Sequence, residues 1–532
     1  MPDTAVEGRH GRHVTMSVRG MLRMRLLKTA TIASILIAGL TAPAHADDAV
    51  VQTTDGPVRG KVTADSRLFQ GIPYAAPPVG ALRWRAPAPV TPWTAVREAT
   101  KPGSACPRRE SPNEPRQGSE DCLYLNVATP AAASSRRLPV MVFVHGGGFT
   151  SGSGGMYDAT RVVKRGQVIV VSMEYRLGAL GFLAHPGLRE PYGGNFGIAD
   201  QQAALRWVRA NIDRFGGDPQ NVTLWGQSAG AVSTCAQLAA TGAKGLFHKA
   251  IVQSGPCGNA LLTRKVAERR GLATARRLGC PDPRTAATCL RAKPLDNLVG
   301  LYEEQVASIE PRRAAMPWGP VADTPAIPVQ PVKALRTSSV PMIQGGTRDE
   351  MTVVVARRHA RMTVAEYQRT VKELFGVRRG KRVLQQYPAD RYASPAWALA
   401  TLLGDHGGKS GACSQLPAND AAARKAQVFG YEFAEPVKGA AINGMPLGVP
   451  HGADVPYLLD SLDPDRPSAP PSPLRDRMVD YWTSFAKSGM PGSDWPVYKP
   501  ATVLSIDAQS VKQIDLSAAH HCDFWKRLDG DS

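Results

Sequence analysis

One serine stands between two glycines at a point where the pattern of the sequence changes. Ser228 lies in the frame Gly226-Gln-Ser-Ala-Gly230, after an apolar β-type run and before a helical pattern. On a sharp strand-to-helix turn a serine hydroxyl projects clear of the sheet, and glycines flank it because the neighbouring backbone leaves no room for a Cβ atom. Ser228 is therefore a candidate nucleophile. The frame alone is weak, because roughly a few tenths of a match arise by chance in a chain of this length.

A serine hydroxyl needs a base to activate it, and the base needs an orienting carboxylate. Downstream of Ser228 the chain supplies Asp349 or Glu350 and then His451, each after a strand-like run or beside a glycine. His406, which also precedes a glycine, is the main alternative among the eleven histidines. We favour His451 as the base because catalytic bases usually lie on loops at strand ends. Spacing leaves the choice between the two acids open.

Three consecutive glycines, Gly146 to Gly148, follow a buried-looking strand over residues 138–143. Glycines in this position leave backbone N–H groups uncrowded, which an oxyanion site requires. A phosphate-binding loop is the alternative, but no G-K-[ST] sequence follows the triplet. We expect His145, which precedes the triplet, to have a structural role.

These residues need a scaffold that brings distant parts of the chain together. Alternating strands and helices with glycines at strand ends predict an α/β architecture with a largely parallel sheet. Proline density predicts ordered coil rather than helix over 71–79, and Asp200, near the start of a helix, is expected to cap it. Beside the strands at 138–143 and 222–226, strand-like runs cover 168–172, 250–254, 340–344 and 426–433, and helical patterns cover 197–215 and 364–402.

The composition, with 43% hydrophobic and 20% charged residues, is that of a soluble globular protein with a large core. A chain of 532 residues could hold several domains, but large α/β enzymes often run this long as one unit with insertions. We predict one domain. The charged, helical stretch from Leu262 to about Val306 is expected to be an insertion that covers the site.

The N-terminal segment has the three-part layout of a secretory signal. Basic residues precede an apolar run over 29–40, and Ala44-His45-Ala46 then form an A-x-A cleavage site. We predict a signal peptide over 1–46, cleaved after Ala46, and a secreted mature domain over 47–532. The apolar run is too short to span a bilayer comfortably, and no later segment is predicted to span one.

The formal net charge is +19, and it falls to +15 without residues 1–46, which hold six Lys/Arg and two Asp/Glu. The remaining basic residues are scattered through helical and loop segments. Scattered charge favours a solvated basic surface, whereas nucleic-acid binding requires a clustered footprint. We therefore predict no nucleic-acid partner.

Eight cysteines in an exported chain indicate disulfides. Proximity favours Cys106 with Cys122 and Cys280 with Cys289, and a bridge from Cys413 to Cys522 could tie the later segment back. The remaining pair, Cys235 and Cys257, is left open as a fourth bridge or as buried thiols. No cysteine or histidine cluster has zinc spacing, so neither a metal nor another cofactor is predicted.

Several motifs together resemble the type-B carboxylesterase/lipase family, which includes the cholinesterases. The resemblance extends from about residue 49 to the segment His521–Trp525. The motifs that carry it are His145–Phe149, Gly226–Gly230, Phe215–Pro219, Glu120–Asn126 and Pro450–Asp454.

The resemblance implies an α/β-hydrolase fold, a mostly parallel sheet flanked by helices, with helical insertions around an active-site gorge. It implies Ser228 as nucleophile, Glu350 as acid and His451 as base of a secreted carboxylesterase that acts on a small-molecule ester. It also supports the three disulfides that proximity favours. The oxyanion donors it implies are the N–H groups of Gly147, Gly148 and Ala229, and Ser254 is implied as a partner of Glu350.

Two departures from the family affect specificity. Position 227 holds glutamine where the family usually has glutamate, which removes a negative charge beside the nucleophile. The loop from Cys106 to Cys122 is short compared with the cholinesterases, and no aromatic residue matches the one that binds a quaternary ammonium, which argues against choline esters. Two further hypotheses are a lipase acting on long-chain esters and a non-catalytic binding or adhesion module of the same fold. A monomer is expected.

Overall fold

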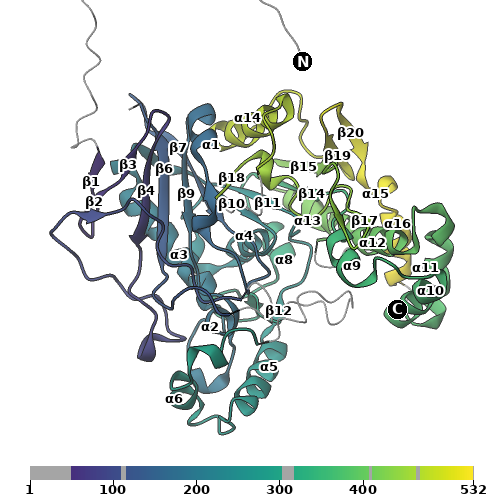
Figure 1. The fold of residues 1–532 in the computed structure, drawn as a ribbon, viewed down its shortest axis with the longest axis horizontal. Helices are drawn as coiled ribbons and strands as arrows, with labels where there is room; N and C mark the ends of the chain where they lie inside the picture. Colours follow the sequence, from purple (N-terminus) through teal and green to yellow (C-terminus); the bar gives the residue numbers. More distant parts are fainter. Residues whose placement is uncertain are drawn as a thin grey trace, which may run out of the picture. The chain divides into compact units, whose positions relative to one another are not determined.

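The computed structural model describes residues 49–109, 115–132, 134–301, 317–406, 410–462 and 468–530 (Figure 1). These residues belong to one unit of the chain, Ala46–Ser532. The predicted signal peptide lies outside the described residues. Within the described ranges, none of the helices combines the length and the apolar character needed to cross a membrane.

An eleven-stranded sheet forms the centre of the fold, counted over the described residues. The seven strands from β19 to β9 run parallel to one another, and the pairs toward both edges are antiparallel. The predicted α/β architecture with a largely parallel sheet is confirmed. In spatial order the strands are β20 (Val511–Asp515), β19 (Thr502–Ile506), β15 (Val428–Phe433), β14 (Met342–Thr347), β11 (Lys249–Gln253), β10 (Gly217–Gln227), β7 (Leu138–Val144), β9 (Ile169–Met173), β6 (Tyr124–Pro130), β4 (Ser66–Pro73) and β3 (Lys61–Val62).

Alternate side chains of the central strands enter two separate hydrophobic cores. In β7, Val140 and Val142 belong to one core, and Met141 and Phe143 belong to the other. Burial on both faces explains why these strands are almost continuously apolar in sequence. The helices that contribute to the first core include α3 (Phe196–Asn211) and α4 (Ala229–Ala239), and those that contribute to the second include α1 (Thr160–Gly166) and α14 (Pro473–Ser488).

A group of helices beside the sheet forms a third core. One of them, α10, begins with a capping box between Thr363 and Glu366, which satisfies two N–H groups at its start. The predicted helical stretch 364–402 is confirmed, and Figure 1 shows these helices together at one edge of the fold. The group comprises α9 (Thr352–His359), α10 (Val364–Phe375), α11 (Val377–Gln386), α12 (Pro395–His406) and α16 (Cys522–Gly530).

Short elements complete the described part of the chain. In the predicted helical insertion, α5 (Arg264–Arg277) and α6 (Ala286–Arg291) form, and residues 302–316 lie outside the described residues. The other short strands and α-helices of the described residues are β1 (Val50–Gln52), β2 (Pro57–Arg59), β5 (Arg97–Glu98), β8 (Tyr157–Asp158), α2 (Gly178–Phe182), β12 (Leu262–Thr263), β13 (Val321–Ala322), α8 (Pro331–Leu335), α13 (Gln415–Ala422), β16 (Ala441–Ile442), β17 (Met445–Pro446), β18 (Asp460–Ser461) and α15 (Leu516–Ala519).

Of two predictions about local structure, the one for residues 71–79 is confirmed and the one for Asp200 is wrong. The stretch 71–79 contains no helix, as expected, and its first three residues continue β4 to Pro73 through a register shift around Gly71, whose φ is 75°. A bulge of this kind lets a strand pass a turn-like sequence. Asp200 does not cap its helix. It is the fifth residue of α3, and its buried carboxylate accepts hydrogen bonds from the Arg176 guanidinium at 2.7 and 2.8 Å, because a buried charge needs a partner.

Four disulfides join the eight cysteines. The pair that the sequence left open forms a bridge between α4 and the segment after β11. Each bridge links two cysteines that are consecutive among the cysteines of the chain. The bridges are Cys106–Cys122, Cys235–Cys257, Cys280–Cys289 and Cys413–Cys522.

Candidate active site

Ser228 lies between the end of β10 and the start of α4 in a strained backbone conformation. Its φ is 57° and its ψ is −121°, and such a conformation costs a non-glycine residue about 1–3 kcal/mol. A Cβ atom on Gly226 would lie 2.1 Å from the carbonyl oxygen of Gly230, and one on Gly230 would lie 1.9 Å from that of Val144. Both glycines of the frame are therefore required by the close passage of backbone. The turn has the geometry of a nucleophile elbow.

His451 and Glu350 come together from loops at the ends of strands. Glu350 follows β14, and His451 follows β15 and the short β17. The Glu350 carboxylate accepts a hydrogen bond from Nδ1 of His451, and its other oxygen accepts one from the backbone N–H of Thr347 at 2.8 Å. The Glu350 side chain is 2% exposed, whereas that of His451 is 29% exposed. A buried acid thus holds an imidazole that solvent and ligands can reach.

The surroundings of His451 raise its pKa. Burial lowers the pKa of the imidazole, but the carboxylates of Glu350 and Asp454 raise it, and the balance lies above the ordinary value. The contact with Glu350 also keeps a proton on Nδ1, which leaves Nε2 as the nitrogen that can accept a proton. Because a general base must be unprotonated, activity that depends on His451 should fall as the pH drops through this raised pKa.

The alternative acid, Asp349, and the alternative base, His406, have partners other than Glu350 and His451. Oδ2 of Asp349 accepts a hydrogen bond from the backbone N–H of Val449 at 2.8 Å. The ring of His406 packs against Trp525 in the third core, with ring centroids 4.4 Å apart. Of the two neighbouring acids, Glu350 is the one in contact with the histidine of the strand-end loop.

Gln227, the residue before the predicted nucleophile, also contacts the predicted base. Its side-chain nitrogen lies 3.3 Å from Nε2 of His451, and the residue is 7% exposed. Nε2 carries a lone pair when Nδ1 holds the proton, so the amide N–H donates this hydrogen bond. The nitrogen that would take a proton from Ser228 is thus engaged by a neutral donor in the resting site.

The glycine triplet passes directly beside the elbow. A Cβ atom on Gly146 would lie 3.0 Å from the Cβ atom of Ser228. The φ angles are 110° at Gly147 and 62° at Gly148, which favour glycine. Ala229 is the first residue of α4, where an N–H group has no partner inside the helix. The three predicted oxyanion donors therefore lie on two short segments that flank the serine.

A buried hydrogen-bond network beneath the site was missed from the sequence. Oδ2 of Asp454 accepts hydrogen bonds from Gln253 at 2.6 Å and from the Tyr431 hydroxyl at 2.8 Å. Gln253 in turn accepts one from the indole N–H of Trp225. Asp454 belongs to the motif that also contains His451, which was the available signal. No pattern singled out the residues on the strands, because their partners are distant in sequence.

Ser254 lies next to this network without the expected partner. The side chain is buried, and its Oγ makes no hydrogen bond with a described residue. Its backbone N–H donates to the carbonyl of Gly345 at 2.8 Å, and its φ is 55°. The expected partnership with Glu350 is therefore not present as a hydrogen bond.

The sequence predicted neither a metal nor another cofactor. In the ranges that the structure describes, no group of three or more His, Cys, Asp or Glu side chains could hold a metal ion. The acidic and imidazole groups of the site instead contact one another.

Comparison with known proteins places this geometry in a family. The chain matches the model of the carboxylesterase family over residues 47–525. It is 33% identical over 486 residues to the para-nitrobenzyl esterase of Bacillus subtilis (strain 168), covering 85% of this chain and 93% of that one. It is 34% identical over 501 residues to the fumonisin B1 esterase of Sphingopyxis macrogoltabida, covering 88% and 89%. A solved thermophilic pNB esterase has a TM-score of 0.76 and 29% identity, covering 90% of this chain and 99% of that one.

The large, mostly parallel sheet with flanking helices makes the protein an α/β hydrolase. Its relatives include esterases from bacteria, and the resemblance seen in the motifs is confirmed. The chain belongs to the carboxylesterase family, and it is a carboxylic ester hydrolase.

Proposed function

We propose that the protein is a secreted serine carboxylesterase that hydrolyses small carboxylic esters through an acyl-enzyme. The observation that carries the catalytic part is the hydrogen bond from Nδ1 of His451 to Glu350, beside a strained elbow that presents Ser228. A carboxylate on Nδ1 orients the imidazole and stabilises its protonated form. These are the requirements for a serine that attacks an ester carbonyl.

The reaction runs in two steps. Ser228 Oγ forms a bond to the ester carbonyl carbon while Nε2 of His451 takes its proton. The tetrahedral oxyanion accepts hydrogen bonds from the backbone N–H groups of Gly147, Gly148 and Ala229. The C–O bond then breaks, and the imidazolium returns the proton to the departing alcohol. Water repeats the sequence on the acyl-enzyme and releases the acid.

The test compares four purified variants on a short-chain p-nitrophenyl ester. Ser228→Ala and His451→Ala should lower kcat by about 10⁴ to 10⁶, and Glu350→Gln by about 10⁴, because the members of a triad act as a unit. Asp349→Asn is the matched control and should retain turnover. The Asp349 side chain accepts a hydrogen bond from the backbone N–H of Val449.

Wild-type turnover in Ser228→Ala would overturn the proposal. A chain that neither hydrolyses esters nor reacts with a serine-directed phosphonate would be a binding module of the same fold. A sharp rise in activity on emulsified long-chain esters would make it a lipase.

Export is supported by the four disulfides together with the predicted signal sequence. Disulfides form and persist in oxidising compartments and are rare in a reducing cytosol. A chain with all of its cysteines in disulfide bridges fits an oxidising compartment. We propose that the mature chain begins at Asp47 and acts outside the cell.

A further inference from the structure

A second imidazole–carboxylate pair lies under the glycine loop, outside the triad. Nε2 of His145 and Oε2 of Glu174 are 4.0 Å apart, and the two side chains are 0% and 3% exposed. Neither of these two atoms has a hydrogen-bond partner among the described residues. Two buried polar atoms that face each other without a partner are costly, and a single proton between them satisfies both.

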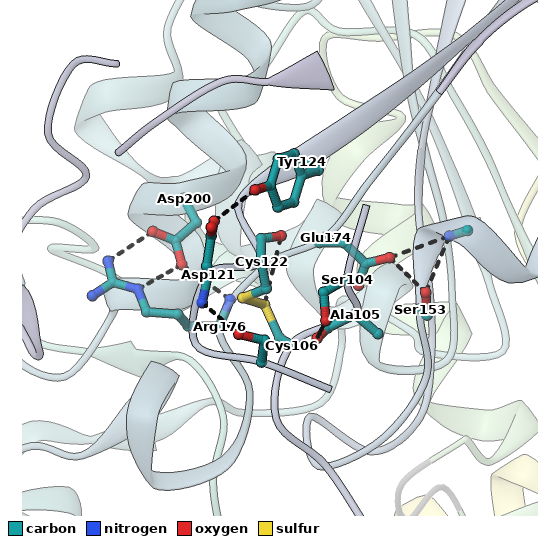
Figure 2. Close-up of a disulfide and its surroundings, with 12 residues drawn as sticks. Ser104, Ala105, Cys106, Asp121, Cys122, Tyr124, Ser153, Glu174, Arg176 and Asp200 are labelled. Atoms are coloured by element: carbon teal, nitrogen blue, oxygen red, sulfur yellow. Dashed lines mark hydrogen bonds and ion pairs between the residues drawn. A yellow bond between two sulfur atoms is a disulfide. The ribbon is translucent and has the colours of Figure 1, made fainter. Parts of the chain in front are cut away.

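The other polar atoms of the pair are already engaged. Nδ1 of His145 lies 2.8 Å from the carbonyl oxygen of Gly146. A carbonyl oxygen can only accept, so Nδ1 carries a proton and Nε2 holds a lone pair. Oε1 of Glu174 accepts hydrogen bonds from the Ser153 hydroxyl at 2.5 Å and from the N–H of Gly155 at 3.2 Å (Figure 2). The remaining oxygen, Oε2, faces the lone pair.

The surroundings favour the proton on the glutamate. Burial raises the pKa of Glu174 to about 7, and burial lowers the pKa of His145 to about 4. The nearby Arg108 guanidinium, on the disulfide-closed loop, acts in the downward direction on both values. Burial also raises the pKa values of Tyr74 and Tyr175, so these phenols stay neutral. Below about pH 7 the pair is therefore a carboxylic acid beside a neutral imidazole.

A buried ion pair also lies in this region. Arg176 and Asp200 form a closed ion pair, drawn in the same view as Glu174 (Figure 2). They act in opposite directions on the pKa of the neighbouring Tyr74. Tyr157 also acts electrostatically on Tyr175.

His145 controls the direction of a peptide unit that carries a predicted oxyanion donor. The peptide between Gly146 and Gly147 is planar and trans, so its C=O and N–H groups point in opposite directions. The Nδ1–H group of His145 holds this carbonyl, and it thereby sets the direction of the Gly147 N–H. The imidazole is itself held by stacking on Tyr175, with ring centroids 4.5 Å apart.

We propose that Glu174 and His145 are positioning residues that aim the backbone N–H of Gly147 at the oxyanion of the ester reaction. The proposal rests on the esterase mechanism given above. A shift of about 1 Å brings Oε2–H of Glu174 to hydrogen-bonding distance from Nε2 of His145. That hydrogen bond fixes the imidazole proton on Nδ1, and Nδ1–H holds the Gly146 carbonyl. Both side chains act on the reaction through this loop.

Loss of the proton from Glu174 reverses the tautomer of His145. A carboxylate on Glu174 favours a proton on Nε2 of His145, which leaves a lone pair on Nδ1. That lone pair would face the Gly146 carbonyl oxygen at 2.8 Å and repel it. The peptide between Gly146 and Gly147 then rotates, and the Gly147 N–H no longer points toward the oxyanion. Because Glu174 loses its proton as the pH rises through about 7, kcat should decline on the alkaline side.

Two substitutions at Glu174 separate this role from simple packing. In Glu174→Gln the amide oxygen replaces Oε1, and the NH₂ group donates to Nε2 of His145 at every pH. This variant should keep kcat within about threefold of wild type at pH 6 and lose the alkaline decline. Glu174→Leu removes the donor and should lower kcat by about 10² to 10³ with little change in KM, because an oxyanion contact acts in the transition state.

Asp121→Asn is the matched control. Asp121 lies in the same region and accepts a hydrogen bond from the Tyr124 hydroxyl at 2.8 Å (Figure 2). This variant should keep the alkaline decline of the wild type. An alkaline decline that persists in Glu174→Gln, or a wild-type kcat in Glu174→Leu, would overturn the proposal.

The tautomer can be measured without turnover. Nitrogen-15 NMR of the wild-type protein at pH 6 should show His145 protonated on Nδ1 and not on Nε2, and the signal should change as the pH rises through about 7. A proton on Nε2 at pH 6 would contradict the proposal even if Glu174→Leu fails to fold. Failure of the esterase mechanism would instead appear as full activity in Ser228→Ala, so the two failures are distinguishable.

Discussion

The side chain of Gln227 places a neutral donor 3.3 Å from Nε2 of His451. We expect Gln227→Glu to raise the pKa of His451 further, because a neighbouring negative charge favours the protonated imidazole. The base must be unprotonated, so the acid limb of the kcat/KM profile should move to higher pH and the rate at pH 7 should fall. A pH series with a chromogenic ester measures the shift.

Gln227→Met serves as the control because it keeps the length of the side chain and adds no charge. It removes the hydrogen bond to His451 and should not move the acid limb upward. If the limb stays at the wild-type pH in Gln227→Glu, the charge at this position does not act on the base.

A residue of the candidate site could be predicted from the sequence where a short motif surrounds it. Ser228 and His451 stand in short frames with glycines, and the structure brings Glu350 into contact with the histidine. The residues that support them could not be found this way. Glu174 looks like any acid after a strand, and its role depends on an atom of His145, which is 29 positions earlier in the chain.

His520 connects helix α12 to strand β15. His520 Nδ1 contacts Asp405 on α12 at 2.6 Å, and its Nε2 contacts Glu432 on β15 at 2.5 Å. The imidazole lies in the segment between α15 and α16 and is 5% exposed. Burial lowers its pKa, but the two carboxylates outweigh burial and raise the pKa to about 10. A protonated imidazole thus joins a strand to a helix.

This contact predicts a loss of stability at alkaline pH. In the unfolded chain the pKa of a histidine is about 6.5, so the stabilisation from His520 is complete below that value and is lost as the pH rises toward about 10. The melting temperature of the wild type should fall between pH 7 and pH 10, and that of His520→Gln should start lower and fall less. Thermal unfolding over this pH range measures both.

His359→Gln is the control for a change of histidine alone. His359 lies on α9, and burial lowers its pKa, so this variant should keep the alkaline loss of the wild type. Equal slopes in wild type and His520→Gln would show that the contact with Asp405 and Glu432 does not stabilise the fold.

Helices and strands could be predicted where the local sequence pattern alone determines them. The central strands are apolar on both faces and were found within a few residues, as were the helices of 364–402. The continuation of β4 past Gly71 was not, because a glycine and a proline argue for a turn and only pairing with β6 holds the strand. Asp200 resembled a cap because the partner that buries it, Arg176, is on another element.

The whole molecule is expected to leave the cell oxidised and trimmed. Protein isolated from the medium should have Asp47 at its N-terminus, and a thiol-alkylating reagent should label no cysteine before reduction, because all eight lie in bridges. Intact-mass and N-terminal measurements check both statements. A start at another residue would correct the signal boundary, and label on Cys235 or Cys257 would show that this bridge is absent in the secreted form.

The pairing of the disulfides carries a consequence for maturation. Since each of the four bridges joins neighbours in the order of the cysteines, no loop that one bridge closes contains part of another. A chain that crosses a membrane N-terminus first presents each cysteine just before its native partner. An oxidase that joins thiols in their order of arrival therefore produces the native set directly. The enzyme should mature in hosts that lack a disulfide isomerase.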